Sequence, residues 1–157
     1  MEIITASMAA SGNKKGKKKM RLWHKDLISV LPDKQLLGQW RECCCIARNI
    51  AVNGSPNHLL VNKIMEYPIS HLWKYGYLIM CEMEERGYDC DFDKFEKWFD
   101  KPWSFITPDY DELFADWHDK RYLRQCFFNL QEKCDCDGMS YFEYEKILIL
   151  MIKKGLI

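Results

Sequence analysis

The chain has 157 residues, of which 48% are hydrophobic and 14% aromatic, so it is long enough to bury a core without disulfide staples. Basic and acidic residues balance at 23 each, but residues 1–20 carry five lysines and one acid, residues 21–63 six basic and three acidic side chains, and residues 64–157 twelve against nineteen. The balance excludes a uniformly basic protein. We expect any anionic partner to bind the N-terminal third.

The eight cysteines do not indicate a disulfide scaffold. Cys43, Cys44 and Cys45 are adjacent and cannot all pair locally, and nothing resembles a secretory signal. We therefore expect reduced thiols in a cytoplasmic protein, bacterial or viral, or nuclear if the host is eukaryotic. No run is long and apolar enough to cross a bilayer, so no membrane partner is expected.

Residues 1–19 contain a lysine cluster, no aromatic side chain and no helical stripe, which predicts a disordered arm. The lysines are compatible with nucleic-acid binding or a nuclear address, and equally with a solubilising tail or an upstream start codon. The sequence changes character at Met20, where MRLWHKDLISVL begins a short apolar run. A methionine in this place is typical of an alternative initiation site.

The main helix is expected over residues 33–51, after Pro32, with the Asp33 side chain accepting from the first free N–H groups. Its core-facing stripe has the three- and four-residue spacing of an amphipathic helix and comprises Leu36, Leu37, Trp40, Cys43, Cys44, Ala47, Ile50 and Ala51.

The polar side of this helix carries the chemistry. One carboxylate, Glu42, falls among the amides of Gln35, Gln39 and Asn49. Lys34, Arg41 and Arg48 form a second, basic ridge at seven-residue spacing, which we call the basic rail.

The remaining pattern predicts further helices and no βαβ unit. A turn at residues 53–56 is followed by expected helices at 58–67, 69–87 (ending at Gly87), 92–99, 109–117, 119–133 and 140–154. The sequence thus predicts an all-α fold with a single helical domain over residues 20–157.

Two candidate metal sites in the sequence are incomplete. Placing Gly138 at the turn of a calcium-binding EF-hand loop puts Lys133 and Tyr144 where acidic ligands belong. Cys134 and Cys136 lack the spacing of a zinc site and have no matching pair. We expect neither a metal nor a cofactor.

Four stretches resemble a known family: MRLWHKDLISVLPDKQLLGQWRECC from Met20, HLLVNKIMEY, LIMCEMEERGY and, more loosely, RYLRQCFFNLQEK. They are similar to the bacterial and viral relatives of phage endonuclease V, which are pyrimidine-dimer DNA glycosylases with AP-lyase activity. The resemblance implies an all-α, monomeric DNA repair enzyme that acts on damaged double-stranded DNA.

The resemblance also implies site residues. The family's nucleophile is an N-terminal α-amine that forms a Schiff base with deoxyribose C1′, and here it falls at Met20. The family's Arg-Glu pair falls on Arg41 and Glu42, with Glu42 as acid and base. Residues expected to contact DNA are Arg21, His24, Lys25, Lys34, Gln35, Arg41 and Arg48.

In the 157-residue chain the Met20 nitrogen is a peptide amide. Translation starting at Met20, removal of the arm, loss of catalysis, or transfer of the role to a lysine such as Lys25 would each resolve this. The alternatives to a glycosylase are a non-catalytic DNA-binding or interaction protein with the same fold, and a helical domain in which Glu42 is merely solvated.

Overall fold

The computed structural model describes residues 20–157. All regular elements in this range are helical, which confirms the expected all-α class, while the expected disordered arm, residues 1–19, lies outside the described residues. In chain order the elements, with η marking 3-10 helices, are η2 (Lys25–Val30), α2 (Asp33–Asn53), η3 (Asn62–Glu66), α3 (Ser70–Glu85), α4 (Asp93–Glu96), η4 (Pro102–Ser104), α5 (Lys120–Asp135) and α6 (Tyr141–Lys153).

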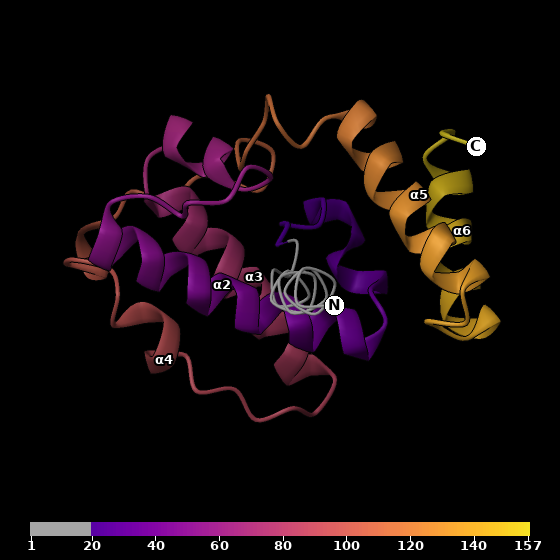
Figure 1. Ribbon diagram of the computed structural model, residues 1–157, viewed down its shortest axis with the longest axis horizontal. Coiled ribbons are helices and arrows are strands. Elements are labelled where there is room, and N and C mark those ends of the chain that lie inside the picture. The colour runs from indigo at the N-terminus through magenta and orange to yellow at the C-terminus, as the bar shows by residue number, and fades with distance from the viewer. Residues whose placement is uncertain (1–19) are drawn as a thin grey trace, which may run out of the picture.

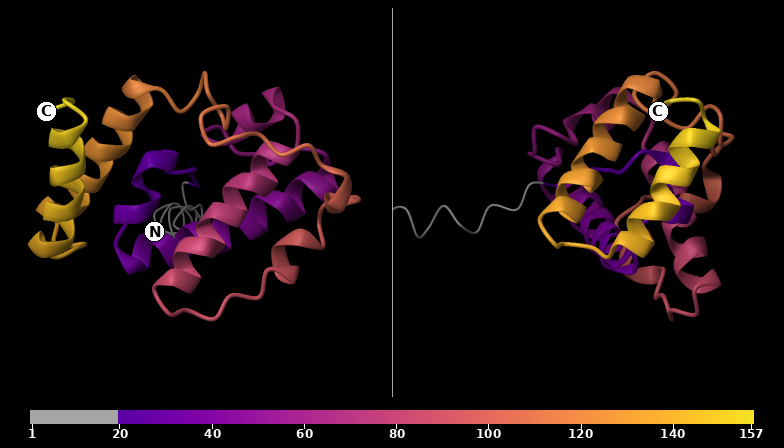
Figure 2. Two further views of the ribbon diagram at one scale, coloured as in Figure 1. Left: turned by 180° about the vertical axis from the view of Figure 1, so that it is seen from behind. Right: turned by 90° about the vertical axis from the view of Figure 1, so that its right-hand side faces the viewer.

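Two helix pairs frame the molecule. α2 and α3 pack along each other, α5 and α6 form an antiparallel pair, and η2 lies between the pairs in contact with α3 and α6 (Figure 1; Figure 2). Leu36 of α2 and Leu72 and Ile79 of α3 are fully buried in the core. Each such side chain stabilises the fold by about 1.5–3 kcal/mol. None of the helices of residues 20–157 combines the length and apolarity needed to span a membrane.

Most of the predicted stripe of α2 is confirmed. Leu36, Trp40, Cys43 and Ala47 are buried, and Leu37, Cys44 and Ile50 are half-buried.

Two assignments on this helix were wrong. Ala51 is exposed, and Gln39, placed on the polar side, is only 1% exposed because its amide finds buried hydrogen-bond partners. The expected cap is also absent, since the Asp33 side chain makes no cap hydrogen bond at the start of α2. It instead accepts from Arg86 Nη1 at 2.9 Å.

The end of α3 matches the prediction. Gly87 has a φ of +88°, its N–H donates to the Glu84 carbonyl at 2.9 Å, and Tyr88 N–H donates to Met83 at 2.9 Å. This pattern ends a helix with a left-handed residue, which glycine adopts without strain.

Three predicted helices are shorter or absent. The segment expected at 58–67 is helical only in η3, and that expected at 92–99 only in α4. Residues 109–117 form turns instead of a helix. Lys25 Nζ donates to the carbonyls of Tyr110 (2.6 Å) and Leu113 (2.8 Å), which a helix would use for its own hydrogen bonds. Phe114 has a φ of +49°, which a right-handed helix cannot contain.

Candidate active site

The segment 20–24, which precedes η2, is held by the side chain of Gln39. Gln39 Nε2 donates to the Arg21 carbonyl at 2.8 Å, and Gln39 Oε1 accepts from Trp23 N–H at 2.7 Å. The Gln39 side chain is buried; its bond to Trp23 is shielded from water and its bond to Arg21 is partly shielded. One residue of α2 therefore sets the backbone of two residues of this segment.

Two tyrosines fix the same segment from other elements. The hydroxyl of Tyr75, on α3, donates to the Trp23 carbonyl at 2.6 Å. The hydroxyl of Tyr122, on α5, donates to the Leu22 carbonyl through a short hydrogen bond. Burial raises the pKa of both phenols, so both remain protonated donors at neutral pH.

Glu42 lies against this segment. Its Oε2 is 3.3 Å from the Arg21 backbone nitrogen and 3.3 Å from Gln39 Nε2, both of which donate to it. The side chain is half-buried. The carboxylate is thus directed at the start of the segment by two fixed donors.

The backbone nitrogen of Met20, one residue before Arg21, contacts the imidazole of His58. Met20 N–H donates to His58 Nε2 at 3.1 Å. Successive backbone nitrogens, of Met20 and Arg21, therefore meet His58 and Glu42. Imidazole and carboxylate are the side chains most used to move protons in catalysis.

A cleft of about 450 Å³ opens beside Glu42. Four cations, one carboxylate, two amides, an indole and a glycine line it: Arg21, Lys34, Arg41, Lys133, Glu42, Gln35, Asn129, Trp23 and Gly38. The Arg21 guanidinium lies over the Trp23 ring, 5.0 Å from its centroid. Excess positive charge around a single carboxylate suits a polyanion that must be acted on by an acid or base.

Residues 20–96, just under half of the chain, match a protein-family model described as pyrimidine dimer DNA glycosylase. Over this region the chain is similar to the pyrimidine dimer DNA glycosylase family. No curated protein and no solved structure gives a significant match.

The region that matches the family model contains most of the site. Of the residues predicted to act on DNA, Arg21, Lys34, Gln35, Arg41 and Glu42 line the cleft together. Met20 does not line the cleft but directly precedes Arg21, which does. Arg48 is exposed on α2 and is not among the lining residues of the cleft, although it continues the basic rail.

His24 and Lys25 are buried in the interior of the protein instead. His24 Nε2 bonds the His118 carbonyl at 2.8 Å, and Lys25 Nζ donates to the carbonyls of the 110–113 turns. Burial lowers the pKa of both side chains. The structure does not bring either of them to the cleft, and their expected contact with DNA stays a prediction.

Five side chains of the candidate site were not predicted from the sequence. Trp23, Asn129 and Lys133 line the cleft, Gln39 holds the segment, and His58 meets Met20. All five lie in the stretches that resemble the family, and Gln39 was already placed beside Glu42, but the pattern did not show which of them reach the site. In the described part of the chain, no group of three or more His, Cys, Asp or Glu side chains is arranged to hold a metal ion.

Proposed function

We propose that the protein is a DNA repair glycosylase and AP lyase that acts on pyrimidine dimers in double-stranded DNA. The observation that carries the proposal is the meeting of the Met20–Arg21 backbone with Glu42 at the edge of a cationic cleft, inside the region that matches the family. The enzyme would work as a monomer without a cofactor.

The reaction uses a free amine at Met20. Its lone pair attacks C1′ of the damaged nucleotide, the glycosidic C1′–N bond breaks, and the bonding electrons leave with the pyrimidine. Glu42 protonates O4′ as the sugar opens to a Schiff base. Removal of a C2′ proton then expels the 3′ phosphate by β-elimination, and water releases the enzyme from the imine.

The cleft supports the DNA side of the proposal. Arg41 and Lys34 on α2, with Lys133 on α5, present cations that can hold backbone phosphates on both sides of Glu42. Arg48 extends the same ridge and would reach phosphates farther along the duplex.

The amine requires a chain whose first residue is Met20. We infer that the active form arises by initiation at Met20 or by removal of the preceding arm. Lys25 is a poor substitute nucleophile, because its amine donates to two backbone carbonyls, of Tyr110 at 2.6 Å and Leu113 at 2.8 Å.

Borohydride trapping on DNA with one abasic site tests the proposal. A form beginning at Met20 should yield a covalent protein–DNA adduct, because borohydride reduces the imine to a stable amine, and peptide mass spectrometry should place the DNA on the Met20 nitrogen. No adduct would overturn the Schiff-base mechanism, and an adduct on a lysine would overturn the assignment of the nucleophile to Met20.

A second function has one observation in its favour. In the full chain the Met20 nitrogen carries a peptide bond. This favours a DNA-binding protein that keeps the fold without catalysis. Salt-sensitive binding to duplex DNA with no adduct from either form would support it.

A further inference from the structure

We propose that His58 is a further catalytic residue, whose imidazole removes a proton from the Met20 amine before the amine attacks DNA. The inference rests on the proposed function and adds to it a second proton-transfer group, separate from Glu42. His58 begins the family-like stretch HLLVNKIMEY, but the sequence pattern gave it no role in the site.

The geometry is that of a proton acceptor in contact with the reacting atom. His58 Nε2 lies 3.1 Å from the Met20 nitrogen and accepts its N–H. This contact requires the lone pair of Nε2 to face Met20, so the ring proton resides on Nδ1. The same lone pair is oriented to receive a proton from an ammonium group at that position.

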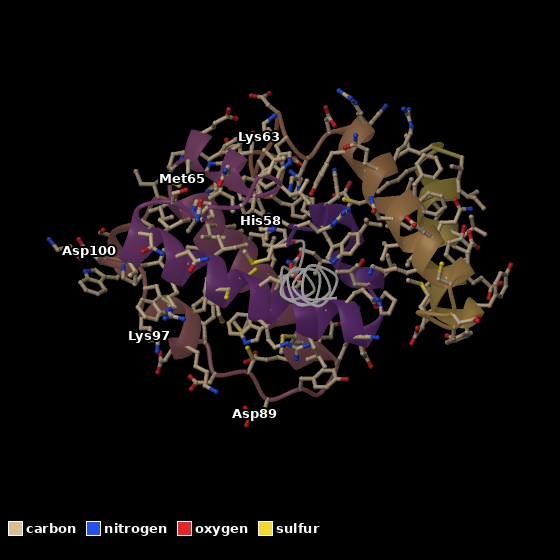
Figure 3. All side chains as sticks on the ribbon, in the orientation of Figure 1. His58, Lys63, Met65, Asp89, Lys97 and Asp100 are labelled. Atoms are coloured by element: carbon tan, nitrogen blue, oxygen red, sulfur yellow. The ribbon has the colours of Figure 1, made fainter. Side chains whose placement is uncertain are left out.

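His58, labelled in Figure 3, lies on a loop that is fixed by its own hydrogen bonds. The His58 N–H donates to Asn62 Oδ1 at 3.0 Å, and the His58 carbonyl accepts from Val61 and Asn62 at 3.0 and 2.9 Å. Asn49 of α2 donates to the Pro56 carbonyl at 3.5 Å. These bonds fix the backbone of His58 against the start of η3 and the backbone of Pro56 against α2. The imidazole is therefore carried by an ordered segment.

The chemistry needs such a group. An α-amine has an ordinary pKa of about 7.7–8.0, so about nine in ten are protonated at pH 7 and lack the lone pair that attacks C1′. In the proposed step an N–H bond of the Met20 ammonium breaks, its electron pair stays on nitrogen, and the proton moves to His58 Nε2. The imidazolium returns this proton when the imine is hydrolysed.

Glu42 is placed for the other task. Its carboxylate is bonded to the Arg21 nitrogen and to Gln39, one residue away from the contact that His58 makes. The two groups can then act at the same time, His58 on the amine and Glu42 on the sugar.

The test compares two substitutions at His58 in single-turnover borohydride trapping on abasic DNA. The full chain, with a site-specific protease sequence ahead of Met20, is purified folded and then cut, so each variant starts from the intact protein. His58→Gln keeps an acceptor for the Met20 N–H but cannot take up the proton. We expect its trapping rate to fall about 100-fold, with abasic-DNA affinity unchanged.

Chemical rescue separates proton transfer from a structural role. For His58→Ala, free imidazole added at constant pH and ionic strength can occupy the vacated position. We expect it to raise the trapping rate of this variant at least tenfold. His71→Gln is the matched control, since His71 is also half-buried and accepts a backbone N–H, from Phe114 at 3.2 Å, away from Met20. It should trap like the parent.

Each outcome is decisive. Parent-like trapping by His58→Gln, or loss in His58→Ala that imidazole does not restore, overturns the role of His58 while leaving the proposed function intact. A cut parent protein that binds abasic DNA but traps nothing overturns the proposed function, and this inference with it.

Discussion

The side-chain amide of Gln39 donates a hydrogen bond to the carboxylate of Glu42, with 3.3 Å between Gln39 Nε2 and Glu42 Oε2. The same amide holds the carbonyl of Arg21 and the N–H of Trp23. A single buried side chain thus fixes the distance between the candidate acid and the segment that would carry the nucleophile.

Gln39→Leu should destabilise the protein, since it removes the partners of two buried backbone groups. Each unpaired group costs about 1–3 kcal/mol, and a lower free energy of unfolding in urea should report the sum. Gln35→Leu is the matched control on the same helix. Gln35 Oε1 has no hydrogen-bond partner among the described residues, so this change should alter stability by less than about 0.5 kcal/mol.

Glu42→Gln should abolish strand cleavage while sparing DNA binding. The amide keeps the size of the side chain but cannot protonate O4′ or take up the elimination proton. Cleavage of a dimer-containing duplex and its affinity are the two measurements. If the variant still cleaves at the parent rate, Glu42 has no acid–base role.

Arg41→Ala should weaken DNA binding and lower the salt dependence, because one phosphate contact is lost. The slope of log affinity against log salt should fall in magnitude by about 1. Arg124→Ala removes a cation that is exposed on α5 but does not line the cleft, and it should leave the slope unchanged. Equal slopes for Arg41→Ala and the parent would contradict the role of the basic rail.

Stability should fall as the pH drops below about 6.5. Burial holds the pKa of His118 well below its ordinary value, so the folded protein keeps this ring neutral while the unfolded chain takes up a proton near pH 6.5. Stability from this group is therefore present above that pH and is lost below it, at up to about 1.4 kcal/mol per pH unit.

Urea unfolding at pH 7.5 and pH 5.5 checks this dependence. Lys25 N–H donates to His118 Nδ1 at 2.9 Å, a bond that the imidazolium cannot accept. Gln in place of His118 accepts the bond at both values, so His118→Gln should lose less stability on acidification than the parent. An identical loss in both proteins would exclude His118 as the cause.

Gly76→Ala should destabilise the contact between α3 and α4. A Cβ at this position would lie 2.4 Å from two ring atoms of Phe95, which is fully buried and cannot move away freely. Overpacking of this kind costs about 1–3 kcal/mol.

Gly38→Ala is the matched change on α2. An added Cβ there meets nothing within 4 Å, and alanine favours the helix by up to about 1 kcal/mol. Opposite shifts of the melting temperature for the two variants are expected. A stabilised Gly76→Ala protein would show that the Phe95 ring moves aside to accommodate the added Cβ.

The parts of the fold that were predicted correctly depend on local pattern. The helix of residues 33–51, the end of α3 at Gly87 and the two C-terminal helices follow from spacing and from end residues within a few positions. The helix expected at 109–117 failed because its carbonyls are bound by Lys25, more than 80 residues earlier in the chain. Such a partner leaves no periodic signal.

The candidate site likewise has a part that could be predicted from local pattern and a part that could not. Arg41, Glu42 and Lys34 share one helix, so their common side could be predicted from spacing. Asn129 and Lys133 enter the cleft from α5, and His58 contacts Met20 from the loop before η3. Only the tertiary structure brings these side chains near α2. Gln39 was misplaced because an amide looks solvent-facing in a sequence, whereas burial depends on partners elsewhere in the fold.

The bonds that hold residues 22–25 also set the order in which the site can form. Leu22 is tied to Tyr122, 100 positions later, and His24 and Lys25 to His118, 94 and 93 positions later. A ribosome makes the N-terminal end of a chain first, and contacts between distant segments wait for both partners. Leu22, the earliest of these residues to be synthesised, is therefore among the last to meet its partner. A nascent chain that has not reached α5 holds the segment 20–24 only through Gln39 and Tyr75.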